Sequence, residues 1–302
     1  MRIEVLDLDY RDTPHTIAAF LVFGDSGDRA DERNAGPVLV ETGPASTLPA
    51  LERGLAEHGV TADDVRHVLV THIHLDHAGA AGWWAQRGAR IYVHPRGAPH
   101  LIDPSKLIAS ATRIYGDLMD TLWGEVAPAP AERVTVVEDG DVIEVEGMKF
   151  TAIETPGHAS HHHVYRLEDV LFTGDAAGIR VPGFDWIDLP APPPEFDLEI
   201  WKRTLDRLRS EAPRAIYRTH FGPSTEVAAE LDALDALLEE TVSTVRGLTE
   251  TGLERPELLA RYSAWVADRA RAAGADDETI RRYEIANPRA MSVDGILRYL
   301  RR

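Results

Sequence analysis

The chain has 302 residues, of which 44% are hydrophobic and 27% charged, so global disorder is excluded and a folded globular protein is expected. It carries 50 acidic residues against 32 basic ones, and the formal net charge of -18 disfavours binding to nucleic acid or to anionic lipid. It has no cysteine, which excludes disulfides, a thiolate nucleophile and sulfur ligands for a metal.

Strand and helix patterns alternate in the first part of the chain. Short apolar runs bounded by Gly, Asp and Pro predict strands over residues 3–8, 16–23, 38–41, 65–71 and 91–93. Apolar residues at helical spacing predict helices over 46–57 and from about 78 to 86. This alternation is typical of an α/β core.

The pattern changes over residues 96–126, where prolines and helical spacing predict an inserted helical segment. It is either a lid or a set of ordinary packed helices. Strands are predicted again over 134–137, 142–145, 150–154, 164–167, 170–173 and 215–219, with a helix over 198–208. The remaining residues, 226–302, form a C-terminal helical region that either caps a pocket or mediates formation of a homodimer.

The N-terminal residues lack the long apolar stretch of a signal peptide, and no apolar run of the sequence approaches the length that spans a bilayer. We therefore expect a cytoplasmic protein without a membrane segment.

The segment from Thr71 to His77 reads Thr-His-Ile-His-Leu-Asp-His and stands between a predicted strand and a predicted helix. Loops at the carboxyl ends of strands are where α/β sheets bind ligands. In an extended stretch His72 and His74 point to the same side, whereas Asp76 and His77 lie where the chain turns into the helix. One loop can therefore supply two ligands to each of two neighbouring cations.

Three later segments place further ligands after predicted strands, namely His158, Asp175 and His220. A single histidine after a strand is more often structural, but the combined set of five His and two Asp predicts a metal centre. Imidazole and carboxylate ligands suit Zn, Fe or Mn. We expect two divalent cations, with zinc as the first choice.

These motifs resemble the metallo-β-lactamase superfamily, whose H-x-H-x-D-H signature stands here at His72–His77. The resemblance covers about residues 1–225 and implies a catalytic domain with a four-layer αββα sandwich, carrying the insertion at 96–126. It implies that His72, His74 and His158 hold one metal, that Asp76, His77 and His220 hold the other, and that Asp175 bridges both. The chain departs from the family at Glu41, a position where Asp is commoner. The resemblance therefore does not predict whether residue 41 makes the usual contact behind the metal ligands, although the ligands themselves are unaffected.

The resemblance implies a hydrolase in which a metal-bound hydroxide attacks the substrate and Asp76 acts as a catalytic residue that orients the nucleophile or moves its proton. No subfamily marker fits: Gly178 stands where lactonases of the family often have Tyr, and Phe221 follows His220 where glyoxalase II has Glu. We predict a small-molecule substrate that is an ester, thioester or lactone. The alternatives are a persulfide dioxygenase with a single iron and a phosphodiesterase of the same fold.

Four residues are candidate substrate contacts. His162 follows the ligand His158 closely, Phe184 and Trp186 lie in the loop after Asp175, and Tyr115 lies in the inserted segment. Each is more often a core residue than a substrate contact.

Overall fold

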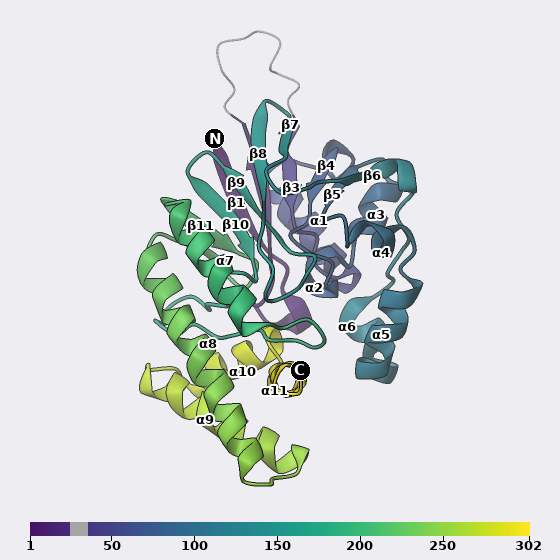
Figure 1. Ribbon diagram of the computed structural model, residues 1–302. Coiled ribbons are helices and arrows are strands. Elements are labelled where there is room, and N and C mark those ends of the chain that lie inside the picture. The colour runs from purple at the N-terminus through teal and green to yellow at the C-terminus, as the bar shows by residue number, and fades with distance from the viewer. Residues whose placement is uncertain (25–35) are drawn as a thin grey trace.

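The computed structural model describes residues 1–24 and 36–302, and the strands of these residues form two six-stranded sheets (Figure 1). The first sheet has the order β1 (Arg2–Asp7), β2 (Ala18–Phe23), β3 (Val38–Val40), β4 (His67–Leu69), β5 (Arg90–Val93) and β6 (Val134–Val136). The second has the order β12 (Gly222–Ser224), β11 (Ala215–Arg218), β10 (Val170–Gly174), β9 (His163–Leu167), β8 (Met148–Glu154) and β7 (Val142–Val145). Both sheets are mixed: β3 to β6 pair in parallel in the first, and β10 and β11 pair in parallel in the second.

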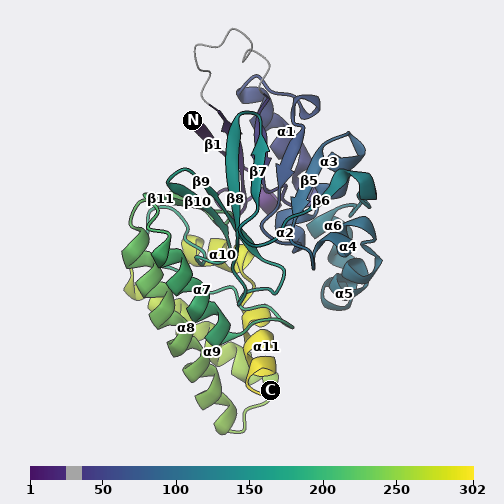
Figure 2. The ribbon, with the colours of Figure 1, turned by 45° about the horizontal axis from the view of Figure 1, so that its top comes forward.

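Helices cover the two outer faces (Figures 1 and 2). On the first sheet lie α1 (Leu48–Glu57), α2 (Leu75–Ala78), α3 (Ala81–Gln86), α4 (Ala98–Ile102), α5 (Ser105–Tyr115) and α6 (Met119–Trp123). Along the second lie α7 (Leu198–Ser210) and α8 (Val227–Glu250). Helices α9 (Arg255–Ala272), α10 (Asp277–Ala286) and α11 (Arg289–Tyr299) lie below the sheets in Figure 1, packed against α8 and one another. Short 3₁₀ turns occur at Tyr10–Asp12, Ala45–Thr47, Ala62–Asp64, Gly116–Leu118 and Ala131–Arg133. Within the described ranges, no helix combines the length and the apolar character needed to cross a membrane.

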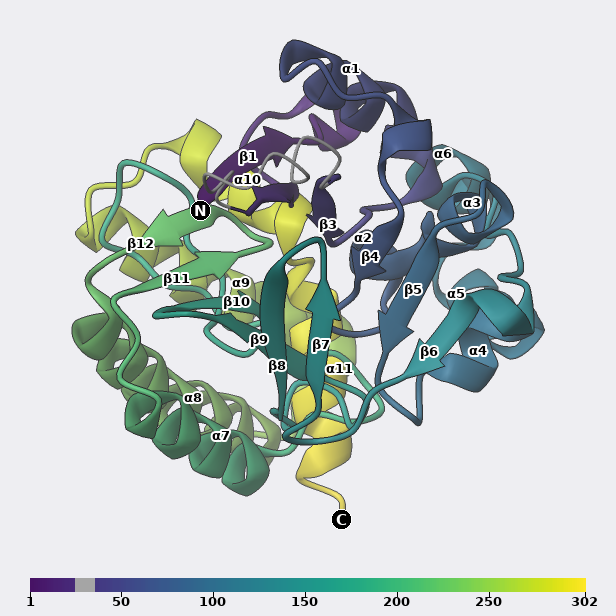
Figure 3. The ribbon, with the colours of Figure 1, turned by 90° about the horizontal axis from the view of Figure 1, so that it is seen from above.

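Three apolar clusters hold these layers together. One lies between the sheets, where Phe20 of β2 and Phe172 of β10 pack with ring centroids 5.5 Å apart. The second joins the first sheet to its helices and includes the buried Trp84 of α3. The third joins the second sheet to α7–α11 and includes the buried Trp201 of α7. Figure 3 shows the helices on either side of the paired sheets. The predicted four-layer fold with C-terminal helices is confirmed.

The predicted strand 65–71 is shorter than expected, since β4 ends at Leu69 and the next residues leave the sheet as a loop. The predicted helix 78–86 starts earlier and is divided into α2 and α3. The chain packs closely at this division, where a Cβ on Gly79 would lie 3.0 Å from Cα of Pro44. The segment 96–126 forms α4–α6, whose apolar residues belong to the same cluster as those of the first sheet.

The C-terminal helices are tied to the core by buried polar contacts. Arg218 at the end of β11 forms an ion pair of 2.7 Å with Glu230 of α8, and both side chains are buried. The Tyr283 hydroxyl of α10 donates to the carbonyl oxygen of Trp186 at 2.6 Å, and the Asn287 amide donates to Asp188 at 2.9 Å. These helices are therefore fixed to the loop that follows β10.

Candidate metal centre

The loop after β4 carries the first group of polar side chains. His74 is extended, with φ −61° and ψ 151°, and directly precedes α2, whose first turn contains Asp76 and His77. The extended course brings His72 and His74 to one side, with His72 Nε2 and His74 Nδ1 2.9 Å apart. His72 and His77 are fully buried, whereas His74 is half-buried and Asp76 has 22% of its side chain exposed.

The second sheet supplies the other three residues from loops at one edge. Strands β8, β10 and β11 run in the same direction, so their carboxyl ends meet at this edge. His158 follows β8, Asp175 follows β10 at once, and His220 follows β11. All three are buried. The fold thus joins loops from both sheets at one end of the sandwich.

The seven predicted ligands come together there in sets that could each hold a metal ion, their ligand atoms lying within 4.8 Å of one another. We name His72, His74 and His158 the first metal group, and Asp76, His77 and His220 the second metal group. Asp175 lies between them, with its carboxylate oxygens 3.3 Å from His77 Nε2 and 3.3 Å from His158 Nε2. It is placed where a bridging carboxylate would stand.

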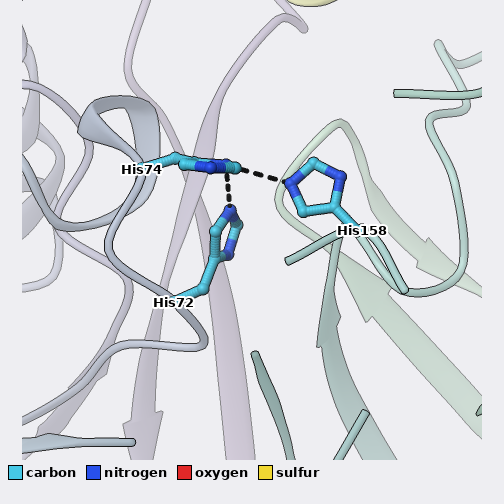
Figure 4. A group of neighbouring side chains, drawn as sticks. All are labelled: His72, His74 and His158. Atoms are coloured by element: carbon cyan, nitrogen blue, oxygen red, sulfur yellow. Dashed lines mark hydrogen bonds between the residues drawn. The ribbon is translucent and has the colours of Figure 1, made fainter. Parts of the chain in front are cut away.

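Figure 4 shows the first metal group, in which three ring nitrogens point toward one another. His74 Nδ1 lies 2.9 Å from His72 Nε2 and 3.0 Å from His158 Nε2. Nitrogens bound tetrahedrally to zinc at its usual bond length would stand about 3.3 Å apart. The three imidazoles are therefore close to the arrangement that a shared cation requires.

The outward nitrogens of the histidines are fixed by hydrogen bonds. His158 Nδ1 donates to the carbonyl oxygen of Pro190 at 2.8 Å, and His220 Nδ1 donates to that of Thr16 at 2.6 Å. Because a carbonyl only accepts, Nδ1 holds the proton and Nε2 keeps a lone pair directed inward. Such partners orient metal-binding histidines in proteins.

Several inward atoms are buried without a hydrogen-bond partner among the described residues: His77 Nε2, His220 Nε2 and Asp175 Oδ1. Buried polar atoms without partners are costly, so their clustering calls for a group that can accept their lone pairs. A divalent cation in the second metal group satisfies this requirement, and the residues there therefore fit the metal that the sequence predicts.

Glu41, where the sequence departs from the family pattern, lies directly behind the second metal group. It is fully buried, with φ +68°, and its Oε1 lies 3.2 Å from His77 Nδ1. Its carboxylate also accepts from the Thr71 hydroxyl at 2.5 Å and from the Thr219 hydroxyl at 3.3 Å. The longer glutamate side chain therefore makes the contact that the sequence left in question.

Charges within the site favour ionised carboxylates. Burial by itself would raise the pKa of Asp175, but His77, His158 and His220 around it hold that pKa well below its usual range. Burial by itself would also raise the pKa of Asp76, but His77 and His220 stabilise its ionised form and lower that pKa to about 2. Both carboxylates are therefore charged and ready to bind cations at neutral pH.

The histidines divide into two electrostatic classes. Burial, with neighbouring histidines adding to it, lowers the pKa of His72 and His74 well below the ordinary value, so these rings are neutral. Burial would also lower the pKa of His77, yet Asp175 and Glu41 raise it well above the ordinary value. A cation that binds the second metal group must therefore displace a proton from His77, and its affinity falls as the pH falls.

The run His161–His163 has three different surroundings. His162, expected to touch substrate, is fully buried and does not line the cavity: its ring contacts the Thr155 hydroxyl at 2.8 Å and accepts from the Asp175 amide at 3.3 Å. The two contacts place His162 behind Asp175. His161 instead lines the cavity, with its Nε2 3.5 Å from Glu195. The run of three histidines in the sequence indicates that this segment lies near the site, but it does not show which of the three faces the cavity.

A cavity of about 340 Å³ opens above the metal groups. Its walls include Tyr115, Trp123 and Leu107 from the inserted helices, so the predicted placing of Tyr115 at the cavity agrees with the structure. Phe184 and Trp186 do not line it. They pack instead against the cluster of the C-terminal helices, because the loop that holds them turns away toward α10.

The sequence did not identify Tyr10 and Ile17, from the start of the chain, as parts of the cavity wall. It suggested the loop that ends at Pro194 and the C-terminal helices only in general terms, and the structure places Pro192–Glu195, residues 285–288 and Met291 at the wall. The C-terminal helices thus contribute to the wall. No periodic pattern marks these positions, since each lies in a loop or at a helix end.

A family model of the metallo-beta-lactamase superfamily matches residues 32–220. A metallo-beta-lactamase fold-containing protein of Sulfurisphaera tokodaii is 30% identical over 164 residues, or 53% of this chain and 62% of that protein. An atrochrysone carboxyl ACP thioesterase of Cryptosporiopsis sp. is 28% identical over 51% of this chain and 36% of its own length. The chain thus spans less than two thirds of these curated relatives. The structure of a metallo-beta-lactamase family protein of Thermus thermophilus superposes with a TM-score of 0.68 at 25% identity, covering 99% of this chain and 93% of that one.

Proposed function

This chain belongs to the metallo-beta-lactamase superfamily, and we propose that it is a hydrolase that uses two divalent metal ions to cleave a small ester, thioester or lactone. The main support for the proposal is that the two metal groups lie side by side around Asp175, at the floor of a cavity with largely apolar walls. One group alone would serve a single metal. The completeness of the second metal group favours the hydrolase over a single-iron dioxygenase.

The first metal group would hold one cation and the second the other, with Asp175 between them. When bound, the cations supply Lewis acidity and lower the pKa of a water molecule that they share. The protein keeps the ligands in place through Glu41, through the carbonyl oxygens of Pro190 and Thr16, and through His162 behind Asp175.

Asp76 has a second role that follows from its position. Its Oδ2 lies 3.4 Å from His220 Nε2, while 22% of its side chain remains exposed and faces the cavity. With a pKa of about 2 it is ionised at neutral pH and accepts a hydrogen bond. It can therefore orient an attacking water molecule and receive its proton.

The cavity wall favours an acyl substrate. Leu107, Ala111 and Trp123 from the inserted helices face Ile285 and Met291 from the C-terminal helices around one space. Apolar side chains on both sides suit an acyl chain, and the net charge of -18 disfavours a nucleic-acid phosphodiester. The relatives named as thioesterases support a thioester as the first substrate to test.

The test combines metal analysis with a substrate screen. Protein purified without chelator is expected to hold close to two equivalents of zinc or manganese, and to hydrolyse thioesters, aryl esters or lactones faster than bis-p-nitrophenyl phosphate. The Asp76→Asn variant should lose at least a hundredfold in kcat, while Asp117→Asn, at an exposed position that does not line the cavity, should not. One iron per chain, together with oxygen consumption on glutathione persulfide, would refute the proposal.

A further inference from the structure

The cavity wall contains two cationic side chains, although the chain as a whole carries a net charge of -18. Apart from the candidate ligands Asp76 and Asp175, the Asp, Glu, Lys and Arg side chains of the wall are Glu195, Arg11 and Lys106. A cation in a cleft attracts an anion locally, even where the field of the whole chain repels it.

The carboxylate of Glu195 is already engaged. It accepts from the backbone amide and the hydroxyl of Ser160, both at 2.8 Å, and lies 3.5 Å from His161. Arg11 and Lys106 are exposed, and neither side chain forms a hydrogen bond or ion pair with another described residue. The two cations are thus available to a ligand, whereas the anion is held by its neighbours.

Helix α5 runs along the cavity wall, with Lys106 near its first residue and Tyr115 at its last. Lys106, Leu107, Ser110, Ala111, Ile114 and Tyr115 all line the space, at the spacing of a single helical face. Tyr115 in the last turn packs on Trp123 with ring centroids 5.1 Å apart, and it interacts electrostatically with Asp76. Lys106 stands in the first turn, about 14 Å away along the helix axis.

One wall therefore presents a phenol beside the metal groups, an apolar middle and a cation at its far end. Arg11 lies next to Tyr10, which stacks on the same Trp123 with ring centroids 5.9 Å apart. A substrate that fills this wall needs a reacting carbonyl, an apolar stretch and a negatively charged group.

We propose that the substrate is an anionic acyl ester or thioester, whose phosphate or carboxylate is bound by Lys106 while its apolar part lies against α5. This inference rests on the proposed function and narrows its substrate class. The anion belongs either to the leaving group, as in a coenzyme A thioester, or to the distal end of the acyl chain.

Three thioesters separate these sources. Hexanoyl-N-acetylcysteamine is neutral, hexanoyl-coenzyme A adds phosphates to the same leaving thiol, and the ω-carboxyhexanoyl thioester of N-acetylcysteamine adds a carboxylate to the acyl end. We expect kcat/KM to rise about tenfold or more for one of the anionic compounds over the neutral one, and to fall toward the neutral value at 0.5 M salt. Equal kcat/KM values for all three would overturn the inference and leave the hydrolase intact.

Matched variants of α5 locate the effect. Lys106→Gln should raise KM for the preferred anionic thioester about three- to tenfold, with kcat and the neutral thioester unchanged. Arg113→Gln removes the same charge from an exposed position of the same helix that does not line the cavity, and it should change neither. Equal losses in both variants would show a long-range charge effect and reject a binding role for Lys106.

A binding measurement keeps the test independent of turnover. The thioethers S-hexyl-coenzyme A, S-hexyl-N-acetylcysteamine and its ω-carboxyhexyl counterpart have no scissile carbonyl, and calorimetry gives their Kd. If an anionic thioether binds more tightly than the neutral one and Lys106→Gln removes the difference, the anion site stands even when no ester is hydrolysed. If all three thioethers bind alike, the anion site is rejected.

Discussion

Glu41 permits a direct test of whether the two metal groups are supported independently. Its buried carboxylate lies 3.2 Å from His77 Nδ1 and contacts the hydroxyls of Thr71 and Thr219, but it contacts none of the histidines of the first metal group. Glu41→Gln keeps the shape of the side chain and removes its charge. The Nδ1–H of His77 then loses an ionised acceptor. The amide NH₂ of the glutamine would also face the Thr71 backbone N–H, so that two donors meet where a hydrogen bond stood.

The size of the effect follows from the position of Glu41 behind a ligand. Loss of such a partner commonly weakens metal binding 10- to 100-fold, which corresponds to about 1.4 to 2.7 kcal/mol. We expect this loss at the second metal group alone. The affinity of the first metal group should change less than threefold, because Glu41 reaches it only through the Thr71 hydroxyl, which lies 3.1 Å from His72 Nδ1, and because His158 has its own acceptor in Pro190.

The assay is a zinc titration of metal-free protein against a competing chelator, which resolves two dissociation constants. Glu195→Gln is the matched control, since it removes a carboxylate that contacts His161 and Ser160 rather than a ligand. It should leave both constants unchanged. An equal loss at both sites in Glu41→Gln, or no loss at either, would refute the reasoning, and the intact first site shows that the variant is folded.

Three further substitutions test other parts of the structure. Asp175→Asn removes the carboxylate that lies 3.3 Å from one histidine of each metal group, so the same titration should show both affinities at least tenfold weaker. Glu230→Ala leaves the buried Arg218 guanidinium without its ion pair and should lower the free energy of unfolding in urea by about 3 to 5 kcal/mol, whereas the exposed Glu250→Ala should change it by less than about 0.5 kcal/mol. Burial lowers the pKa of His163 to about 3, with His94 adding to the shift. Below its unfolded pKa of about 6.5 only the unfolded chain binds this proton, so stability falls by about 2 kcal/mol between pH 8 and pH 5. His163→Leu should remove that part of the loss, and an unchanged pH dependence of the urea midpoint would contradict the assignment.

The sequence determined the fold and the candidate metal ligands because both depend on local patterns. Alternation of short apolar runs with helical spacing marks the strands and helices, and a strand followed by a polar loop places His72, His158 and Asp175 at strand ends. Strands β8 and β10 run in the same direction, so His158 and Asp175 reach one edge of the second sheet. His72 follows a strand of the first sheet, and only the packing of the two sheets brings it to the same end.

Tertiary structure decided everything that depends on which way a loop side chain faces or on residues distant in the chain. Glu41 and Thr219 meet across 178 positions, and nothing in either segment predicts the contact. Within the histidine run, the loop course exposes His161 to the cavity and buries His162 behind a ligand. The direction in which Phe184 faces could not be predicted for the same reason, since an irregular loop has no period from which it follows.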